Sequence, residues 1–270
     1  MSGLRPALRA GVLLVLLLPF GWALLASLLP EVVWFGGEPA GRPTLDHYRA
    51  LLAEHDVLRP LRNSLVVAAL TTLLAVPLGA ACGYALARLR FPGRRTFAGV
   101  LLLVSLLPQI TLVNPLFLVL RHLGLVHSFP GLVLPYLTFA LPLAVYLAGT
   151  TFRSLPAELE EAARLDGAGR FRALVLVLAP AAAPGLASAG LLTFLYCWNE
   201  FLFALSFTLG PERWTLPVAI AMLQGRYRIP WGQVLAASML AALPVVAVAA
   251  LLQRRVVEGI TAGAVRGGGS

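Results

Sequence analysis

Lysine is absent from the 270 residues: all 21 basic side chains are arginine, and residues of either charge make up only 12% of the chain. A soluble domain averages about 25% charged residues, so roughly half of the usual charge is missing. Hydrophobic residues rise to 59% instead. Without lysine, the chain holds neither a GxxxxGK[ST] phosphate-binding loop nor a Schiff-base residue. A large soluble catalytic domain is excluded by the same composition.

Cysteine and histidine are also scarce. Cys82 and Cys197 stand alone in apolar runs, without the CxxC or Cys/His spacing of a metal site, and we predict that both are small buried hydrophobic residues. The histidines lie in predicted loops without an HExxH pattern, and we expect them to be solvated: His47, His55, His122 and His127. We therefore predict no metal site and no catalytic residue.

Six apolar runs are present, at 11–29, 63–86, 97–120, 131–151, 184–208 and 234–252. A membrane crossing needs about 20 such residues, so the runs predict an all-α integral membrane protein with six transmembrane helices. The first run is longer than the apolar part of a secretory signal, about 7–15 residues, which favours an uncleaved helix. Prolines inside the runs, Pro108 among them, should kink the helices.

Arginine indicates the orientation. If the N-terminus is inside, 13 arginines fall in inner segments and 8 in outer ones, with the highest density in RLRFPGRR after the second run. By the positive-inside rule both termini are cytoplasmic. The predicted organisation is a cytoplasmic N-terminus (1–10), a first helix (11–29), an extracytoplasmic segment (30–62), a five-helix core (63–252) and a cytoplasmic tail (253–270).

The outer segment contains TLDHYRALLAEHDV, which reads as a short amphipathic helix with its apolar side chains, Leu45, Tyr48, Leu51 and Leu52, on one face. Two interpretations stay open. The helix could cover the membrane interface, or it could be a docking site for an external partner.

The longest inner loop, 152–180, holds four of the twelve acidic residues. Pro156 suits a first helical turn, acidic side chains follow it, and Gly167 suits a helix stop, so 156–166 predicts a short helix and 168–178 a second one. Ala162 and Ala163 give the first helix a low surface that another protein could approach. Taken alone, this is an ordinary capped loop helix.

Glu161-Ala162-Ala163, followed by Gly167 and later by Pro180, resembles the EAA motif of the permease subunits of ATP-binding-cassette (ABC) importers. Ala179 stands where that pattern has leucine. Further blocks are similar to the maltose-type carbohydrate permeases, in order from residue 63 onward: NSLVVAALTT, YALARLRFPGRR, TFLYCWNEFLFAL, TLPVAIAMLQG and RRVVEGITAGAVRG.

The resemblance implies a type I ABC importer permease fold with a cytoplasmic coupling helix that seats in a groove of a separate ATPase. Glu161 would be its charged anchor and Gly167 the turn that sets the angle to the next helix. The residues so implied for ATPase coupling are Glu161, Ala162, Ala163, Asp166, Gly167 and Pro180, and those for a C-terminal ATPase contact are Gly263 and Arg266.

The same resemblance implies the partners: a second homologous permease, two ABC ATPase subunits, an extracytoplasmic solute-binding protein and membrane lipid, with no nucleic acid. This chain would bind no cofactor, because ATP and Mg²⁺ would be used by the ATPase. It would be a transport subunit and not an enzyme, located as a multi-pass protein in a bacterial-type inner membrane.

Polar residues inside the runs are candidates for the solute pathway or for contact between permease subunits. A charge at mid-bilayer costs about 2.5–3.5 kcal/mol on insertion scales, so Glu200, the one acidic residue within a run, should face the bundle or water. Asn199 precedes it, and Gln109 and Asn114 form a second polar patch. All four could equally form hydrogen bonds that only hold helices together.

The solute is expected to be a sugar or oligosaccharide. The same architecture could carry glycerol-phosphate or an oligopeptide. A self-contained secondary transporter should show midplane carboxylates and inverted repeats, and a membrane enzyme should show a catalytic cluster. Neither pattern is evident in the sequence.

Overall fold

The computed structural model describes residues 4–30, 42–225 and 229–266, with side chains placed for 11–30, 42–225 and 229–251. It divides into two units. Unit 1 comprises Met1–Leu61 and Leu216–Pro244, and unit 2 comprises Arg62–Thr215 and Val245–Ser270. The regular elements of the described residues are all helices, with no strand among them.

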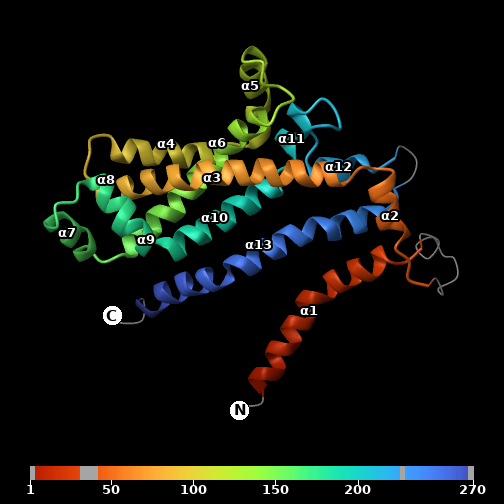
Figure 1. Ribbon diagram of the computed structural model, residues 1–270, viewed down its shortest axis with the longest axis horizontal. Helices are drawn as coiled ribbons and strands as arrows, with labels where there is room; N and C mark the ends of the chain where they lie inside the picture. Colours follow the sequence, from red (N-terminus) through yellow and green to blue (C-terminus); the bar gives the residue numbers. More distant parts are fainter. Residues whose placement is uncertain (1–3, 31–41, 226–228, 267–270) are drawn as a thin grey trace. The chain divides into compact units, whose positions relative to one another are not determined.

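Unit 2 carries most of the helices (Figure 1). They are α3 (Leu58–Arg88, which begins in unit 1), α4 (Arg94–Leu106), α5 (Gln109–His122), α6 (Pro130–Ser154), α7 (Glu158–Leu165), α8 (Arg170–Ala173), the π-helical turn η2 (Leu174–Leu178), α9 (Ala179–Ala181), α10 (Ala183–Trp198) and α11 (Leu202–Phe207). Within this unit α7 lies at one end and α5 and α11 lie at the other.

The core of unit 2 is built around α6, the most buried of its long helices. Glycines bring the backbone of α3 close to it, since a Cβ added to Gly83 would lie 2.7 Å from the amide nitrogen of Gly149. A Cβ added to Gly79 would lie 2.6 Å from that of Ala144. Small residues at such spacing let two membrane helices pack closely, because the bilayer supplies little hydrophobic force between them. The α3–α6 pair is therefore a tightly packed element.

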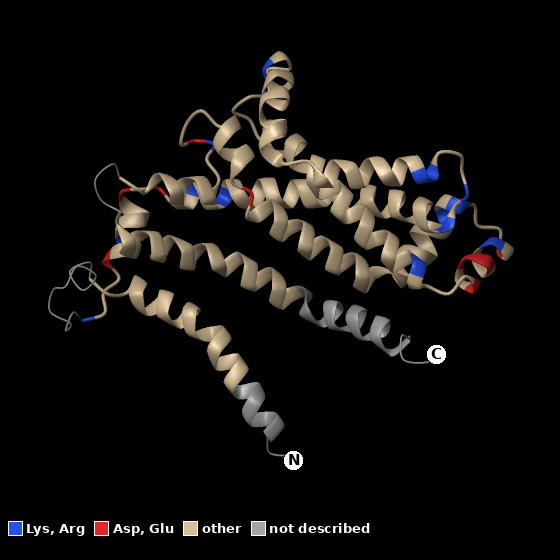
Figure 2. Ribbon diagram, turned by 180° about the vertical axis from the view of Figure 1, so that it is seen from behind, with Lys and Arg blue, Asp and Glu red and all other residues tan. Residues whose placement is uncertain are grey.

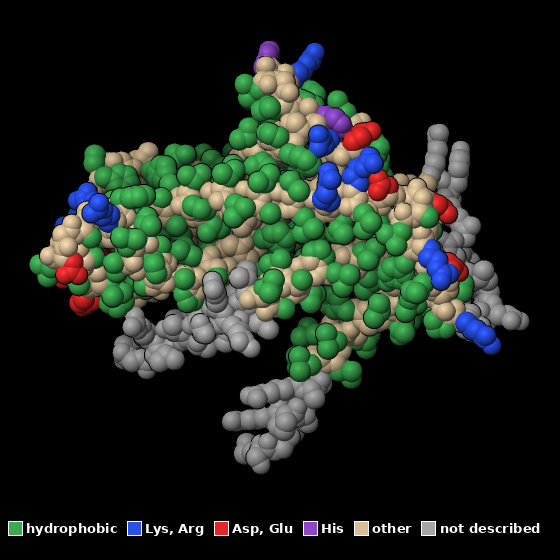
Figure 3. Space-filling model, in the orientation of Figure 1, with side chains coloured by type: hydrophobic (Ala, Val, Ile, Leu, Met, Phe, Trp, Pro, Cys, Tyr) green, Lys and Arg blue, Asp and Glu red, His purple; other side chains and the backbone are tan. Residues whose placement is uncertain are grey.

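The outside of unit 2 is apolar. No residue of α4 is buried, although most of them are hydrophobic. Figure 3 shows hydrophobic side chains over the middle of this unit and charged ones toward its ends. An exposed apolar area of this extent is stable only against lipid or another membrane subunit.

Three described helices are long and apolar enough to cross a membrane: α3, α6 and the Trp231–Leu251 part of α13 (Trp231–Arg266). Two bent pairs raise the number to five if each pair is one span, and Gly11–Ser27 of α1 (Leu4–Ser27) is a shorter apolar helix. The multi-pass helical fold is thus confirmed, while the number six remains a prediction.

The third predicted span, 97–120, is not one helix. It breaks at Leu107 and Pro108, and α4 and α5 meet at 101°. The expected kink is a complete break because the proline forces the residue before it out of the helical region: Leu107 has ψ 132°.

The fifth predicted span, 184–208, is also interrupted. Its first helix, α10, ends at Trp198, and the chain resumes as α11 after Phe201. The second helix expected at 168–178 is likewise divided into α8 and η2. Pro180 explains the wider turn of η2, because its ring would clash with the carbonyl four residues earlier in a regular helix.

Unit 1 contains α1, α2 (Asp46–Ala53), α12 (Leu216–Met222) and the first part of α13. The predicted apolar face of α2 is partly wrong: Leu51 is buried, but Leu45 and Leu52 are exposed. His47 is buried instead and lies within hydrogen-bonding distance of the Leu29 carbonyl, 2.9 Å from Nε2. The expectation that this histidine is solvated is therefore wrong, because it closes the end of α1.

Candidate functional site

The predicted loop helix is present as α7, two residues shorter at its start and one shorter at its end than predicted. Its inward face is small and apolar: Ala163 is 5% exposed, and Leu159 packs on a buried cluster that includes Phe152 and Leu178. Eight residues are too few for a stable isolated helix in water. The position of α7 is therefore fixed by its contacts with the core.

A polar contact adds to this attachment. The hydroxyl of Tyr84, on α3, donates to Oε1 of Glu160 at 2.9 Å, and Nη2 of Arg164 lies 3.6 Å from the same oxygen. Glu160 thus faces the core, while its neighbour Glu161 is exposed. Sequence reasoning singled out Glu161 and missed the inward contact of Glu160, since no local pattern separates the two.

The outward face of α7 combines acidic and apolar groups. Glu161, Ala162 and Asp166 are exposed beside Leu165, whose side chain is 90% exposed. Phe171 on α8, 78% exposed, extends the apolar surface. Two large hydrophobic side chains directed outward on a charged loop indicate a surface that a partner covers. Neither was singled out from the sequence, because the helical phase decides which apolar residue of the loop faces out.

Gly167 ends α7 as the sequence predicts. Its φ of 82° is in the left-handed region, its amide donates to the Arg164 carbonyl at 3.0 Å, and the amide of Ala168 donates to the Ala163 carbonyl at 2.9 Å. This closing turn satisfies carbonyls that the helix would otherwise leave free. Pro180, the last residue of the predicted motif, is exposed in α9.

Charge is concentrated around this loop. Figure 2 shows the acidic residues of α7 at one end of unit 2, with arginines on the neighbouring segments. The segments around α7 contain Arg88, Arg90, Arg94, Arg95, Arg153, Arg170 and Arg172, and α7 itself contains Arg164. The α7 end is thus the most basic part of the unit, apart from an acidic patch on α7 itself.

A cavity of about 840 Å³ opens between α4, α6 and α10. Most of its wall is apolar, with hydroxyl groups from Ser105, Tyr146 and Tyr196 and arginines toward the α7 end, Arg94, Arg95 and Arg153. Of the four predicted pathway residues, Gln109 comes closest to it, since its amide nitrogen hydrogen-bonds the Tyr196 hydroxyl. Asn114 is exposed on α5 and does not line the cavity.

Asn199 and Glu200 lie in the break between α10 and α11. Glu200 is 6% exposed, and its carboxylate accepts hydrogen bonds from the amides of Phe203 (2.8 Å) and Ala204 (3.1 Å) in the first turn of α11. Asn199 donates to the Leu195 carbonyl at 2.8 Å, at the end of α10. Asn199 therefore satisfies a carbonyl at the C-terminal end of α10, and Glu200 satisfies two amides at the N-terminal end of α11. A carboxylate at a helix N-terminus is also favoured by the helix dipole.

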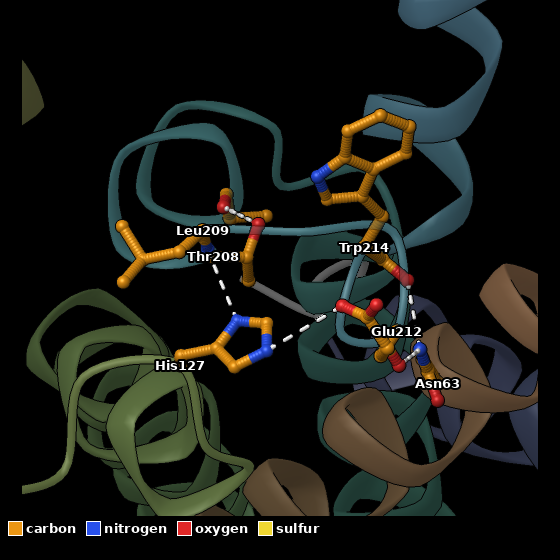
Figure 4. A network of polar contacts seen from close by, with 7 residues as sticks. Asn63, His127, Thr208, Leu209, Glu212 and Trp214 are labelled. Carbon is orange, nitrogen blue, oxygen red and sulfur yellow. Dashed lines mark hydrogen bonds and ion pairs between the residues drawn. The ribbon is translucent and has the colours of Figure 1, made fainter.

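At the far end of unit 2 a polar network holds the loop after α11 (Figure 4). Asn63, fully buried, donates to the carbonyls of Glu212 and Trp214, each at 3.0 Å. Nδ1 of His127 accepts from the Leu209 amide at 3.0 Å, and its Nε2 lies 3.7 Å from the Glu212 carboxylate. His127 is thus a structural residue of a loop, not a freely solvated one.

Gly263 and Arg266, predicted to contact the ATPase, lie in the part of α13 where only the backbone is described. The backbone of α13 continues as helix to Arg266. Among the described residues, no group of three or more His, Cys, Asp or Glu side chains could hold a metal ion.

Comparison with known proteins gives one consistent result. Residues 75–261 match the family described as "Binding-protein-dependent transport system inner membrane component". The chain is 42% identical over 254 residues to the trehalose transport system permease protein SugB of Mycobacterium tuberculosis, covering 93% of each chain. It is 38% identical over 258 residues to the trehalose/maltose transport system permease protein MalG of Thermococcus litoralis, covering 94% of this chain and 93% of the relative.

Among solved structures, a chain of a bacterial ABC transporter involved in the import of the acidic polysaccharide alginate is similar, with a TM-score of 0.71 and 25% identity. The match covers 94% of this chain and 95% of that one. A second, the MetNI methionine ABC transporter in an inward-facing conformation, has a TM-score of 0.61 at 18% identity, covering 75% of this chain and 94% of that one. The second likeness concerns the fold alone.

Proposed function

The chain belongs to the family of inner-membrane components of binding-protein-dependent transport systems, and from this membership we propose that α7 is the helix through which it couples to a separate ATPase. The protein is a multi-pass permease subunit of an ABC importer and not an enzyme. Its family implies a solute-binding protein and an ATPase as partners.

The observation that carries the proposal is the outward face of α7. Leu165 is 90% exposed next to Glu161, on a helix whose inward face is anchored to the core by Ala163 and Leu159. A large aliphatic side chain exposed among polar and charged residues marks a surface that a partner covers. Since the α7 end is also the most arginine-rich, the positive-inside rule supports our proposal that it, and both termini, lie in the cytoplasm of a bacterial-type cell.

The finer assembly is part of the same proposal. A second homologous permease would cover the apolar outside of unit 2, and two ATPase subunits would bind ATP and Mg²⁺, which this chain would not. Gly263 and Arg266 would add a C-terminal contact to the ATPase pair.

We further propose a sugar or oligosaccharide as the solute. The names of both relatives refer to the disaccharides trehalose or maltose. The cavity offers uncharged hydroxyl groups from Ser105, Tyr146 and Tyr196 away from its arginine end, and Gln109 adjoins it. Such groups suit a neutral hydroxylated solute. Asn114, Asn199 and Glu200 would act near the pathway or at the contact between permeases.

Association with the ATPase tests the docking role. We expect Leu165→Ser to weaken binding of the purified permease to the ATPase about tenfold or more, since burying a leucine contributes about 1.5–3 kcal/mol. Glu161→Ala should weaken it to a similar extent, since a hydrogen bond to a charged group contributes about 1.5–3 kcal/mol. The dissociation constant in detergent or nanodiscs is the measurement. Leu123→Ser is the matched control, because Leu123 is 60% exposed at the far end of unit 2.

Full ATPase binding by both α7 variants, or an equal loss in the Leu123 control, would contradict the docking role. The same preparation, supplied with the solute-binding protein, addresses the solute class. Trehalose or maltose should stimulate ATP hydrolysis, whereas an oligopeptide or glycerol-phosphate should not.

A further inference from the structure

Two side chains one helical turn apart on α3, Tyr84 and Arg88, form hydrogen bonds to α7 and to the end of α6. The Tyr84 hydroxyl donates to Glu160 Oε1 at 2.9 Å, on α7. The Arg88 guanidinium donates to the Phe152 carbonyl from Nε (3.1 Å) and Nη2 (2.8 Å), and from Nη2 also to the Leu155 carbonyl. Residues at i and i+4 share one helix face, so both contacts leave α3 in the same direction.

The hydrogen bond between Tyr84 and Glu160 is largely withdrawn from water. Tyr84 is 4% exposed, and its ring meets that of Phe152 edge-on with centroids 5.9 Å apart. The side chain of Glu160 is 13% exposed. A hydrogen bond to a charged group that is mostly withdrawn from water is stronger than a surface contact. This hydrogen bond adds a directional contact to the apolar ones that Ala163 and Leu159 make.

Arg88 acts at the other side of the junction. The last carbonyls of a helix have no partner within it, and a cation at that end also meets the negative pole of the helix dipole. The Arg88 guanidinium bonds the carbonyls of Phe152, in the last turn of α6, and of Leu155, which follows the helix. Gly79 and Gly83 allow α3 to pack closely against α6. The two helices therefore reach the α6–α7 junction as one packed pair.

We propose that Tyr84 and Arg88 are positioning residues for energy coupling: they fasten α7 to the α3–α6 pair, so that a displacement of α7 by the ATPase moves both membrane helices together. This inference rests on the proposed function of α7 as the docking helix. Neither residue lies in the 152–180 loop itself.

The experiment uses the assembled importer in nanodiscs. Tyr84→Phe removes only the hydroxyl and keeps the ring against Phe152. Glu160→Ala removes the acceptor, while Glu160→Gln keeps an oxygen that can accept from Tyr84. Two quantities are measured: hydrogen–deuterium exchange of α7, and the amount of solute transported per ATP hydrolysed. ATPase binding is measured on the same samples.

We expect Tyr84→Phe and Glu160→Ala to raise the exchange of α7 amides about tenfold, as befits the loss of one charge-assisted hydrogen bond. Solute transported per ATP should fall severalfold in both while the ATPase stays bound. Glu160→Gln should restore most of the wild-type ratio. Arg88→Lys, which keeps the charge but loses the forked donors, should lower the ratio in the same way.

The inference is overturned if Tyr84→Phe leaves the transported solute per ATP at the wild-type value, whether or not α7 exchange changes. Failure of the proposed function is seen separately, because it would appear as unchanged ATPase binding by Glu161→Ala and Leu165→Ser. Loss of ATPase binding in Tyr84→Phe would also count against the inference, since the hydroxyl would then serve docking and not transmission.

Discussion

Gly167 and Gly169 are two glycines of one turn with different backbone requirements. Gly167 has φ 82°, in the left-handed region, whereas Gly169 has φ −67° and ψ 164°, which any residue adopts. A Cβ at either position would meet no atom within 4 Å. The two glycines therefore differ in backbone conformation and not in steric room. Comparing alanine at the two positions tests whether the left-handed turn at Gly167 sets the orientation of α7.

Gly167→Ala should cost about 1–2 kcal/mol, the strain of a left-handed alanine, and should weaken ATPase binding about tenfold as the end of α7 moves. Gly169→Ala should leave binding unchanged and gain about 0.4–1 kcal/mol of stability by restricting the unfolded chain. The ATPase dissociation constant and the thermal midpoint of the two variants are the measurements. Equal binding by both would show that the turn does not set the docking angle.

Among helices, the contact of α3 with α6 is one that a single methyl group should disturb. A Cβ on Gly83 would lie 2.7 Å from the Gly149 amide nitrogen and 2.9 Å from the Val145 carbonyl oxygen, so the backbones must separate. We expect Gly83→Ala to destabilise the protein by about 1–3 kcal/mol, the usual cost of overpacking. Lower solute transport per ATP should accompany it, because the pair would no longer move as one element.

Gly99→Ala provides the control for this change. Gly99 lies in α4 with no atom within 4 Å of an added Cβ. Alanine there should raise helix stability by as much as about 1 kcal/mol, the difference in helix propensity. Thermal unfolding in detergent separates the two variants, and a similar loss in both would contradict close packing as the cause.

The sequence predicts elements better than their interruptions. Apolar runs place α3 and α6 within a few residues, and Gly167 marks the end of α7, because both signals are local. The break at Asn199–Phe201 contains neither proline nor glycine, and it depends on Glu200 accepting two amides of the next helix. The hydropathy of the run does not predict this break, because no helix-breaking residue stands there.

Contacts between distant residues are the other limit. Glu160 and Glu161 are adjacent and identical in type, yet only Glu160 meets Tyr84, 76 positions earlier. His47 is buried for a similar reason, because it meets the Leu29 carbonyl. Each outcome follows from packing between helices, which hydropathy and spacing do not encode. The sequence identifies the motif of the 152–180 loop, but it does not predict which way the side chains of Glu160, Glu161 and His47 point.

For the whole molecule, the distribution of arginine predicts which end of unit 2 faces the cytoplasm. Eight arginines lie on α7 or in the segments around it, at positions 88, 90, 94, 95, 153, 164, 170 and 172. The far end of unit 2 has Arg62, Arg121 and Arg213. A cluster of this density is difficult to translocate, so it should remain on the cytoplasmic side. The cavity, α7 and the junction held by Tyr84 and Arg88 then meet the cytoplasm together.

Cysteine labelling of intact cells tests this topology. Arg121→Cys and Arg172→Cys replace exposed arginines at opposite ends of unit 2. We expect a membrane-impermeant maleimide to label the variant at position 121 in intact cells and to label the one at 172 only after permeabilisation. The wild type supplies the background, since Cys197 is buried and Cys82 is partly so. The reverse pattern would place α7 outside the cell, where no ATPase could reach it, and would refute the coupling role with the orientation.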